Sequence, residues 1–236
     1  NIMALPKLNT QKFELMIPST DKKVKYRPFL VKEEKILLQA QQSGKATEMA
    51  DALVEVIENC TFADVKVDNL PSFDIEYIFL KIRSKSVGEK VTLNVTCPDD
   101  NETKVKHTVD LSKIEVEVEE DHTNTIELTD SVKVIMSYPT IKTFSGASVN
   151  ELDAEQIVKL TTRCIHQIVD GVETYEAADL SEAELVEFVE NLTQEQFAKL
   201  QSFFTTMPRL KHVINVTNPK TKKKGKVTLQ GMQSFF

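Results

Sequence analysis

The sequence VTLNVTCP, residues 91–98, alternates apolar and polar side chains and then breaks at a Cys-Pro pair. This period of two is typical of a half-buried β-strand, because successive side chains of a strand point to opposite faces. Its second half, NVTCP at residues 94–98, is echoed by NVTNP at residues 215–219. Each copy precedes a polar turn and a further strand-like run, at residues 104–111 and 225–229. The repeat predicts two similar β-hairpins.

Alternation also extends around the first hairpin. Ile114, Val116 and Val118 alternate with glutamates, and a similar pattern runs through residues 132–136. These runs predict half-buried antiparallel strands, which have one face on the core and one in water. A shorter strand pair is predicted near the N-terminus, at residues 13–18 and 24–29.

Helical periodicity fills most of the remaining chain. Residues 71–87 are apolar nearly all round, which is typical of a helix buried on several sides. Ser181 and Glu184, like Thr193 and Gln196, have the spacing of a capping box, so a helix is predicted to begin at each pair. Further helices are predicted at residues 32–42, 47–60 and 152–169.

These patterns predict an α+β fold, in which helical segments are combined with antiparallel β-hairpins and a small sheet. We expect three consecutive regions. Residues 1–88 form an N-terminal hairpin plus helices, residues 89–140 form an antiparallel β region, and residues 141–236 form a helical region that ends in a C-terminal β-hairpin.

Composition narrows the functional classes. The chain has 236 residues, of which 41% are hydrophobic and 28% charged, so it is long and apolar enough to fold as a soluble globular protein. Its net charge of −7 disfavours general affinity for nucleic acids and membranes, which are themselves anionic. The lysine-rich turn at residues 220–226 is the exception. It is interpreted first as a solvated hairpin tip, and second as a contact for nucleic acid or an acidic protein face.

No cofactor and no metal site is predicted. A zinc knuckle needs two close thiolates, but the turn at residues 97–100 offers one cysteine and the turn at residues 218–221 offers none. Cys164 and His166 are two positions apart, so on a helix they would face different ways and would not form a catalytic pair. The six glycines form no phosphate-binding loop, and no known catalytic motif is present.

Three stretches resemble a known family. Residues 26–35 (YRPFLVKEEK), residues 73–88 (FDIEYIFLKIRSKSVG) and the tail from Met207 to Phe236 are similar to the baseplate hub subunits of T-even-like, contractile-tailed bacteriophages. The resemblance implies a non-enzymatic structural protein of the virion, located in the tail baseplate and assembled in the cytoplasm of the bacterial host. Its implied partners are other baseplate hub proteins or the tape-measure protein.

Interfaces of this kind usually rely on a few aromatic or arginine anchors. The candidates for partner binding are five residues: Tyr26, Arg27, Phe29, Phe235 and Phe236. The two terminal phenylalanines either fold back onto this domain or dock on a partner.

Several alternatives stay open at this point. The chain is either a hub subunit of the finished virion or an assembly chaperone for hub or tape-measure proteins that leaves the particle. A cell-wall hydrolase ranks below both, because nothing in the spacing of the 36 acidic residues selects a catalytic pair. Self-association into a homo-oligomer is also left open.

Overall fold

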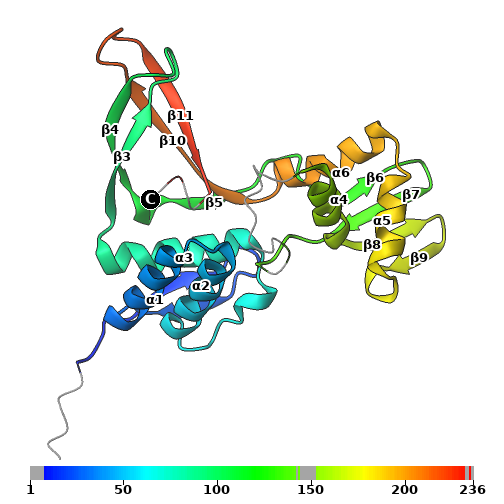
Figure 1. Ribbon diagram of the computed structural model, residues 1–236, viewed down its shortest axis with the longest axis horizontal. Coiled ribbons are helices and arrows are strands. Elements are labelled where there is room, and N and C mark those ends of the chain that lie inside the picture. The colour runs from blue at the N-terminus through cyan, green and yellow to red at the C-terminus, as the bar shows by residue number, and fades with distance from the viewer. Residues whose placement is uncertain (1–7, 142, 144–152, 232–233, 235–236) are drawn as a thin grey trace, which may run out of the picture. The chain divides into compact units, whose positions relative to one another are not determined.

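The structure is a computed structural model that describes residues 8–141, 143, 153–231 and 234 (Figure 1). Its helices are α1 (Val31–Ser43), α2 (Ala46–Cys60), α3 (Ser72–Val87), α4 (Ala154–Arg163), α5 (Glu182–Glu190) and α6 (Gln194–Thr206). Its strands are β1 (Phe13–Met16), β2 (Lys23–Tyr26), β3 (Lys90–Thr96), β4 (Lys104–Asp110), β5 (Glu115–Glu117), β6 (Thr125–Glu127), β7 (Val132–Met136), β8 (Ile165–Asp170), β9 (Glu173–Glu176), β10 (Arg209–Thr217) and β11 (Lys224–Gln230). This mixture of helices and small antiparallel sheets confirms the predicted α+β class.

The chain forms two compact units. Unit 1 consists of Asn1–Val67, Asp74–Glu115 and Lys211–Phe236, and unit 2 consists of Asp68–Phe73 and Val116–Leu210. The three consecutive regions expected from the sequence cut the chain at other places, and they stay a prediction about its organisation.

Unit 1 is built around α3. The side chains of Ile78, Leu80 and Ile82 are fully buried. Three further side chains of the helix are almost fully buried: Ile75, Tyr77 and Phe79. The prediction of a helix buried on several sides is therefore confirmed. The helix also buries Lys81, whose Nζ donates to the carbonyl oxygens of Ser112 and Ile114 at 2.9 and 2.8 Å. These bonds compensate for the removal of its charge from water.

The two hairpins of the sequence repeat are present in unit 1. Strand β3 pairs with β4, and β10 pairs with β11, both antiparallel. Thr96 pairs with Lys104 in the first hairpin, and Thr217 pairs with Lys224 at the matching position of the second. The repeat therefore reflects two similar hairpins, in which the matching threonine pairs with the lysine that begins the next strand and the enclosed turns are residues 97–103 and 218–223. Strand β10 lies between β11 and β5 in a three-stranded sheet.

Unit 2 has a four-stranded sheet with strand order β6-β7-β8-β9 and three helices, α4, α5 and α6. Its core holds Val134 of β7, Ile168 of β8 and Leu200 and Phe203 of α6, with Leu185 of α5. Both capping boxes are formed, since Ser181 accepts from the backbone N–H of Glu184 and Thr193 accepts from that of Gln196. The predicted starts of α5 and α6 are thus confirmed.

The helix predicted over residues 152–169 is wrong over its last part, residues 164–169. Helix α4 ends at Arg163, and the following residues form β8, which pairs with β7 on one side and β9 on the other. The cause is tertiary. Ile165, Ile168 and Val169 are β-branched and fit a pleated surface, and two neighbouring strands supply hydrogen bonds that a lone helical turn would forgo.

Candidate partner-binding surfaces

The turn between β2 and α1, residues 27–30, is held by an internal ion pair. Nη2 of Arg27 lies 2.9 Å from Oε1 of Glu33, and Nη1 of the same guanidinium donates to Oε2. The backbone N–H of Leu30 also donates to Oε2 of Glu33, at 2.8 Å. Glu33 is completely buried and Arg27 is 8% exposed. Their mutual attraction therefore has to compensate for the hydration that both charges lose on folding.

The electrostatics of this pair follow from its partners. Burial by itself would raise the pKa of Glu33, but the Arg27 guanidinium and the N–H of Leu30 outweigh burial, and the pKa is lowered. The pKa of Arg27 is raised, mainly by its hydrogen bonds to Glu33. The pair is therefore ionised wherever the protein is folded near neutral pH.

The five candidate residues for partner binding differ in how far they are exposed to solvent. Tyr26 is 3% exposed and packs against Phe13, with ring centroids 5.6 Å apart. Arg27 is buried as described above, whereas Phe29 is half-buried. The residues that follow Phe29 are accessible, because Leu30 is 42% and Val31 80% exposed. Phe235 and Phe236 lie outside the described residues.

The tips of the two hairpins, residues 97–103 and 218–223, are joined side by side, as Figure 1 shows. Asn218 is completely buried at this junction. Its Nδ2 donates to Oδ1 of Asp99 at 2.9 Å and to Oδ2 of Asp100 at 2.8 Å. Its Oδ1 accepts from the backbone N–H groups of Lys220 and Thr221, which fixes the orientation of the amide.

Further contacts close the junction. Oγ1 of Thr221 donates to Oδ2 of Asp99 at 2.6 Å. A Cβ atom added to Gly225 would lie 2.5 Å from Cγ of Pro98, a distance too short unless the proline ring or the backbone of Gly225 shifts. We call this set of residues, Pro98, Asp99, Asp100, Asn218, Thr221 and Gly225, the hairpin clasp. Nothing in the spacing of these residues along the sequence predicts the contact between the two turns, because Asn218 and Asp99 are 119 positions apart.

Residues 97 and 218, which match in the sequence repeat, also match in geometry. The backbone N–H of Cys97 donates to the carbonyl of Thr103, and that of Asn218 donates to the carbonyl of Lys223. Cys97 is buried beside the clasp, and burial raises the pKa of its thiol. Across the described residues, no group of three His, Cys, Asp or Glu is placed to hold a metal ion.

Asn218→Ala should destabilise the protein by about 1–3 kcal/mol, because it removes the buried amide and leaves its hydrogen-bond partners unsatisfied. Equilibrium unfolding in urea measures this loss. Thr205→Ala is the matched control, since its hydroxyl is exposed and bonds only within α6. Equal free energies of unfolding for Asn218→Ala and the wild type would contradict the clasp.

The clasp should weaken at acid pH. Hydrogen bonds from Thr221 and Asn218 lower the pKa of Asp99, and those from Thr103, the N–H of Glu102 and Asn218 lower the pKa of Asp100. Because both folded-state pKa values lie below the ordinary value of 3.8, the stabilisation is complete above that value and is lost as the pH falls below it.

Carboxyl-carbon NMR titration checks this expectation. Asp99 and Asp100 should titrate below their ordinary pKa in the wild type, and Asp99 should move toward it in Thr221→Val. Ordinary titration of Asp99 and Asp100 in the wild type would rule out the bonds.

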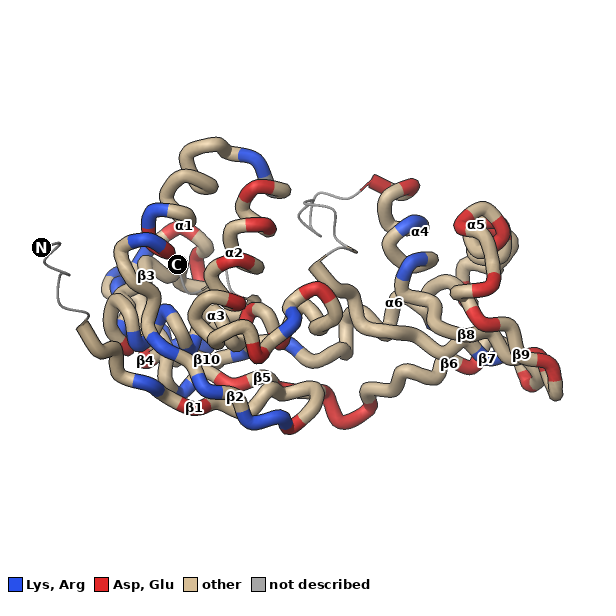
Figure 2. Tube along the Cα trace, turned by 90° about the horizontal axis from the view of Figure 1, so that it is seen from below, with Lys and Arg blue, Asp and Glu red and all other residues tan. Residues whose placement is uncertain are grey.

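The two units carry opposite charge. Unit 1 has 23 Lys and Arg against 17 Asp and Glu, a net of +6, and unit 2 has 6 against 19, a net of −13. Residues 211–230 contain six lysines and no acidic residue, whereas residues 164–198 contain nine acidic residues and no lysine or arginine. Figure 2 shows the acidic residues along α5 and beside β9. The mild overall charge therefore conceals two strongly charged surfaces.

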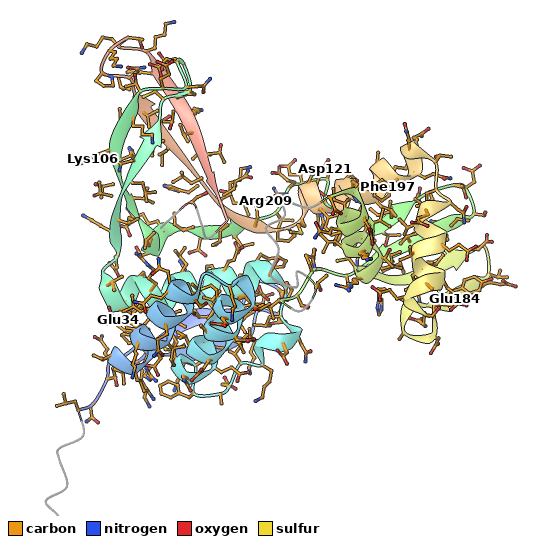
Figure 3. All side chains as sticks on the ribbon, in the orientation of Figure 1. Glu34, Lys106, Asp121, Glu184, Phe197 and Arg209 are labelled. Carbon is orange, nitrogen blue, oxygen red and sulfur yellow. The ribbon has the colours of Figure 1, made fainter. Side chains whose placement is uncertain are left out.

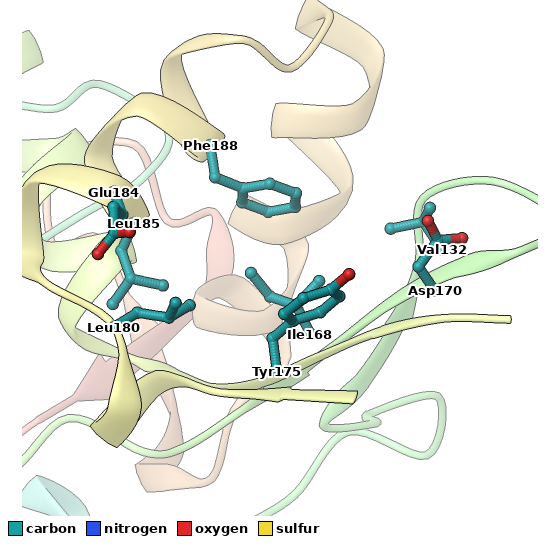
Figure 4. A pocket seen from close by; sticks show the side chains of 8 residues that line it. All are labelled: Val132, Ile168, Asp170, Tyr175, Leu180, Glu184, Leu185 and Phe188. Carbon is teal, nitrogen blue, oxygen red and sulfur yellow. The ribbon is translucent and has the colours of Figure 1, made fainter. Parts of the chain in front are cut away.

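The acidic surface of unit 2 contains a pocket of about 260 Å³ between the sheet and α5 (Figure 4). Its lining is mostly apolar, with Ile168, Tyr175 and Phe188 in the middle. Asp170 and Glu184 stand at opposite ends. The carboxylate of Glu184 accepts from the hydroxyl and N–H of Ser181, which lowers its pKa, so this end of the pocket is anionic at neutral pH.

The two remaining cysteines lie in the protein interior. Cys60 and Cys164 are buried, and desolvation raises the pKa of their thiols to about 11 and about 12. At these values the reactive thiolate is scarce near neutral pH. Among the described parts of the chain, no helix combines the length and apolar character that crossing a membrane requires.

Comparison with known proteins identifies the family. A search of curated proteins and a search of solved structures each returned no match. The family model described as T4 bacteriophage base plate protein matches residues 9–236, which is nearly the whole chain and includes the hairpin clasp and both charged surfaces. The chain therefore belongs to the T4 bacteriophage base plate protein family, and its role is that of a structural protein of a phage baseplate.

Proposed function

We propose that this protein is a subunit of the central hub of the tail baseplate in a contractile-tailed phage, and that it works through protein–protein contacts without catalysis. The observation that carries the proposal is the family match over residues 9–236. The hub assignment within that family rests on the resemblance of residues 26–35, 73–88 and 207–236 to hub subunits. Other hub proteins or the tape-measure protein are the proposed partners, and the host cytoplasm is the proposed place of assembly.

The N-terminal turn is proposed as one contact surface. Phe29 is half-buried and Leu30 and Val31 are exposed, so this apolar stretch is available to a partner. Leu38, which is 50% exposed, lies two helical turns after Val31 and extends the same face of α1. In this proposal the buried side chains of Tyr26 and Arg27 fix the conformation of the turn, and Phe29 contacts the partner protein. Phe235 and Phe236 are proposed as a second anchor.

Mass spectrometry of purified, DNA-filled particles tests the hub assignment. A fixed copy number of this protein in every particle is the expected result. Its presence in infected cells combined with absence from finished particles would overturn the hub assignment and favour the alternative, an assembly chaperone that leaves before completion.

A complementation experiment tests the contact surface. Phage lacking this protein would be supplied with the variant Phe29→Ala/Val31→Asp, which alters the accessible side chains and leaves Arg27 and Glu33 in place. We expect a folded variant that is not incorporated into particles. The matched control is Leu8→Asp, which introduces the same charge at another exposed apolar position of unit 1. Normal incorporation of Phe29→Ala/Val31→Asp would reject this surface.

A further inference from the structure

The second hairpin carries a cationic surface at residues 220–226, which include the start of β11 and are called the lysine-rich tip below. Lys220, Lys222, Lys223, Lys224 and Lys226 are all exposed. None of these five forms an ion pair with any residue that the structure describes. The hairpin clasp fixes the backbone on which they stand, because Asn218 and Thr221 of the same hairpin bond to Asp99 and Asp100. A surface fixed in advance loses less conformational entropy when it binds.

The pocket of unit 2 has the features that a lysine side chain requires. A lysine has an apolar stem and a cationic head, so it suits a cavity with apolar walls and charged ends. Ile168, Tyr175 and Phe188 would cover the stem, and Asp170 or Glu184 would meet the head. The rings of Tyr175 and Phe188 would add a cation–π contribution. Asp170 forms no ion pair with another described residue.

Charge and exposure extend this match beyond the pocket. Val172 is fully exposed and Tyr175 is 42% exposed at the turn and strand beside it. Glu173, Asp179 and Glu187 are exposed around the same end of unit 2. Figure 3 labels Glu184 on α5 of this acidic surface. A partner that covers the site must therefore bring several lysines or arginines close together, which a hairpin tip with five lysines does.

We propose that this protein associates with a second copy of itself, with the lysine-rich hairpin tip of one copy bound to the acidic pocket of unit 2 in the next. The two surfaces are different, so the contact is heterologous and can be repeated from copy to copy into a ring or a filament. This proposal rests on the proposed assembly function and names one of its partners.

Sedimentation of the purified full chain tests the self-association. The wild type should form oligomers whose proportion rises with protein concentration. Raising the salt to about 1 M should shift it toward monomer, because the Debye length then falls to about 3 Å. A wild type that stays monomeric at every concentration at low salt would overturn the proposal.

Charge-reversal variants test the two surfaces. Variant A, Asp170→Lys/Glu187→Lys, changes the pocket surface and spares Glu184, whose carboxylate caps α5. Variant B, Lys222→Glu/Lys223→Glu, changes the tip. Each should raise the dissociation constant of self-association at least about tenfold, a loss of about 1.4 kcal/mol. Lys35→Glu/Lys66→Glu is the control for variant B, because it changes the net charge equally at exposed lysines elsewhere in unit 1.

Mixing the two variants is the decisive step. In the mixture the unaltered tip of A meets the unaltered pocket of B, whereas the altered tip of B and the altered pocket of A have no suitable partner. Dimers of one A and one B should therefore form in the mixture, although each variant alone associates at least about tenfold more weakly than the wild type. If the mixture stays monomeric while both variants retain wild-type folding, the proposed pairing is wrong. The hub assignment itself is judged by the particle composition, so either proposal can fail without the other.

Discussion

Arg27→Met should lower the free energy of unfolding by about 3–5 kcal/mol, because it leaves the fully buried carboxylate of Glu33 without its guanidinium. The methionine keeps most of the apolar stem, so the loss reports the charge and its hydrogen bonds. Lys32, whose Nζ lies 3.4 Å from Glu33, is 65% exposed at its side chain and is a weak substitute. Urea unfolding at neutral pH measures the effect.

Two comparisons make the expectation specific. Lys23→Met breaks the ion pair with Glu14, in which both side chains are solvent-exposed, and should cost clearly less than Arg27→Met. Arg27→Met/Glu33→Gln should be more stable than Arg27→Met, since the neutral amide still accepts from the N–H of Leu30. If Arg27→Met lowers the free energy of unfolding as little as Lys23→Met does, the buried pair stabilises the protein no more than an exposed ion pair.

The pH dependence of Arg27→Met follows from the same pair. In the wild type the pKa of Glu33 is lowered, so its stabilising contribution is present at neutral pH and is lost as the pH falls. Without Arg27, burial would instead raise the pKa of Glu33 and favour its neutral form. The difference in stability between wild type and variant should therefore shrink as the pH is lowered.

Phe203→Ala should destabilise unit 2 by about 3–5 kcal/mol, the usual cost of removing a buried phenylalanine from a core. Phe203 is 1% exposed, and its ring lies 5.4 Å from that of Tyr138 and 5.3 Å from those of His122 and Phe204. Removing it would leave a cavity and also weaken the support of Tyr138, whose hydroxyl is hydrogen-bonded to His122 at 2.9 Å.

Hydrogen exchange followed residue by residue locates the effect. Amide protection should fall in β6–β9 of unit 2, whereas the amides of the β3–β4 hairpin in unit 1 should retain theirs. Phe204→Ala is the matched control, because Phe204 is only partly buried and should cost clearly less. Equal destabilisation by both substitutions would mean that Phe203 is not the centre of this core.

Much of the local structure was determined by the sequence itself. The starts of α5 and α6 follow from Ser181 and Thr193, because the groups that cap each helix are three residues apart and need no distant partner. The two hairpins follow from alternating side chains and turns, which also lie close together in the chain. The burial of α3 follows from its composition, since a helix without a polar face has to be covered on several sides.

The pairing of distant segments was decided only in three dimensions. Residues 165–170 continue a helical pattern in the sequence, but the pairing of β8 with β7 and β9 makes them a strand. Asn218 is hydrogen-bonded to Asp99, which is 119 positions away in the sequence, and no local spacing predicts that contact. Arg27 is a candidate anchor because interfaces often rely on arginines, but the sequence does not show that its guanidinium pairs with Glu33 and that both side chains are buried.

The same distinction applies to the candidate surfaces. Composition alone separates a lysine-rich tail from an acidic segment, because charge is a property of each residue. The pocket requires the fold, since β7, β8, β9 and α5 each supply part of its lining. Capping hydrogen bonds and side-chain periodicity involve residues a few positions apart, so they can be predicted from the sequence. Strand pairing, buried ion pairs and pockets depend on contacts between residues that only folding brings together.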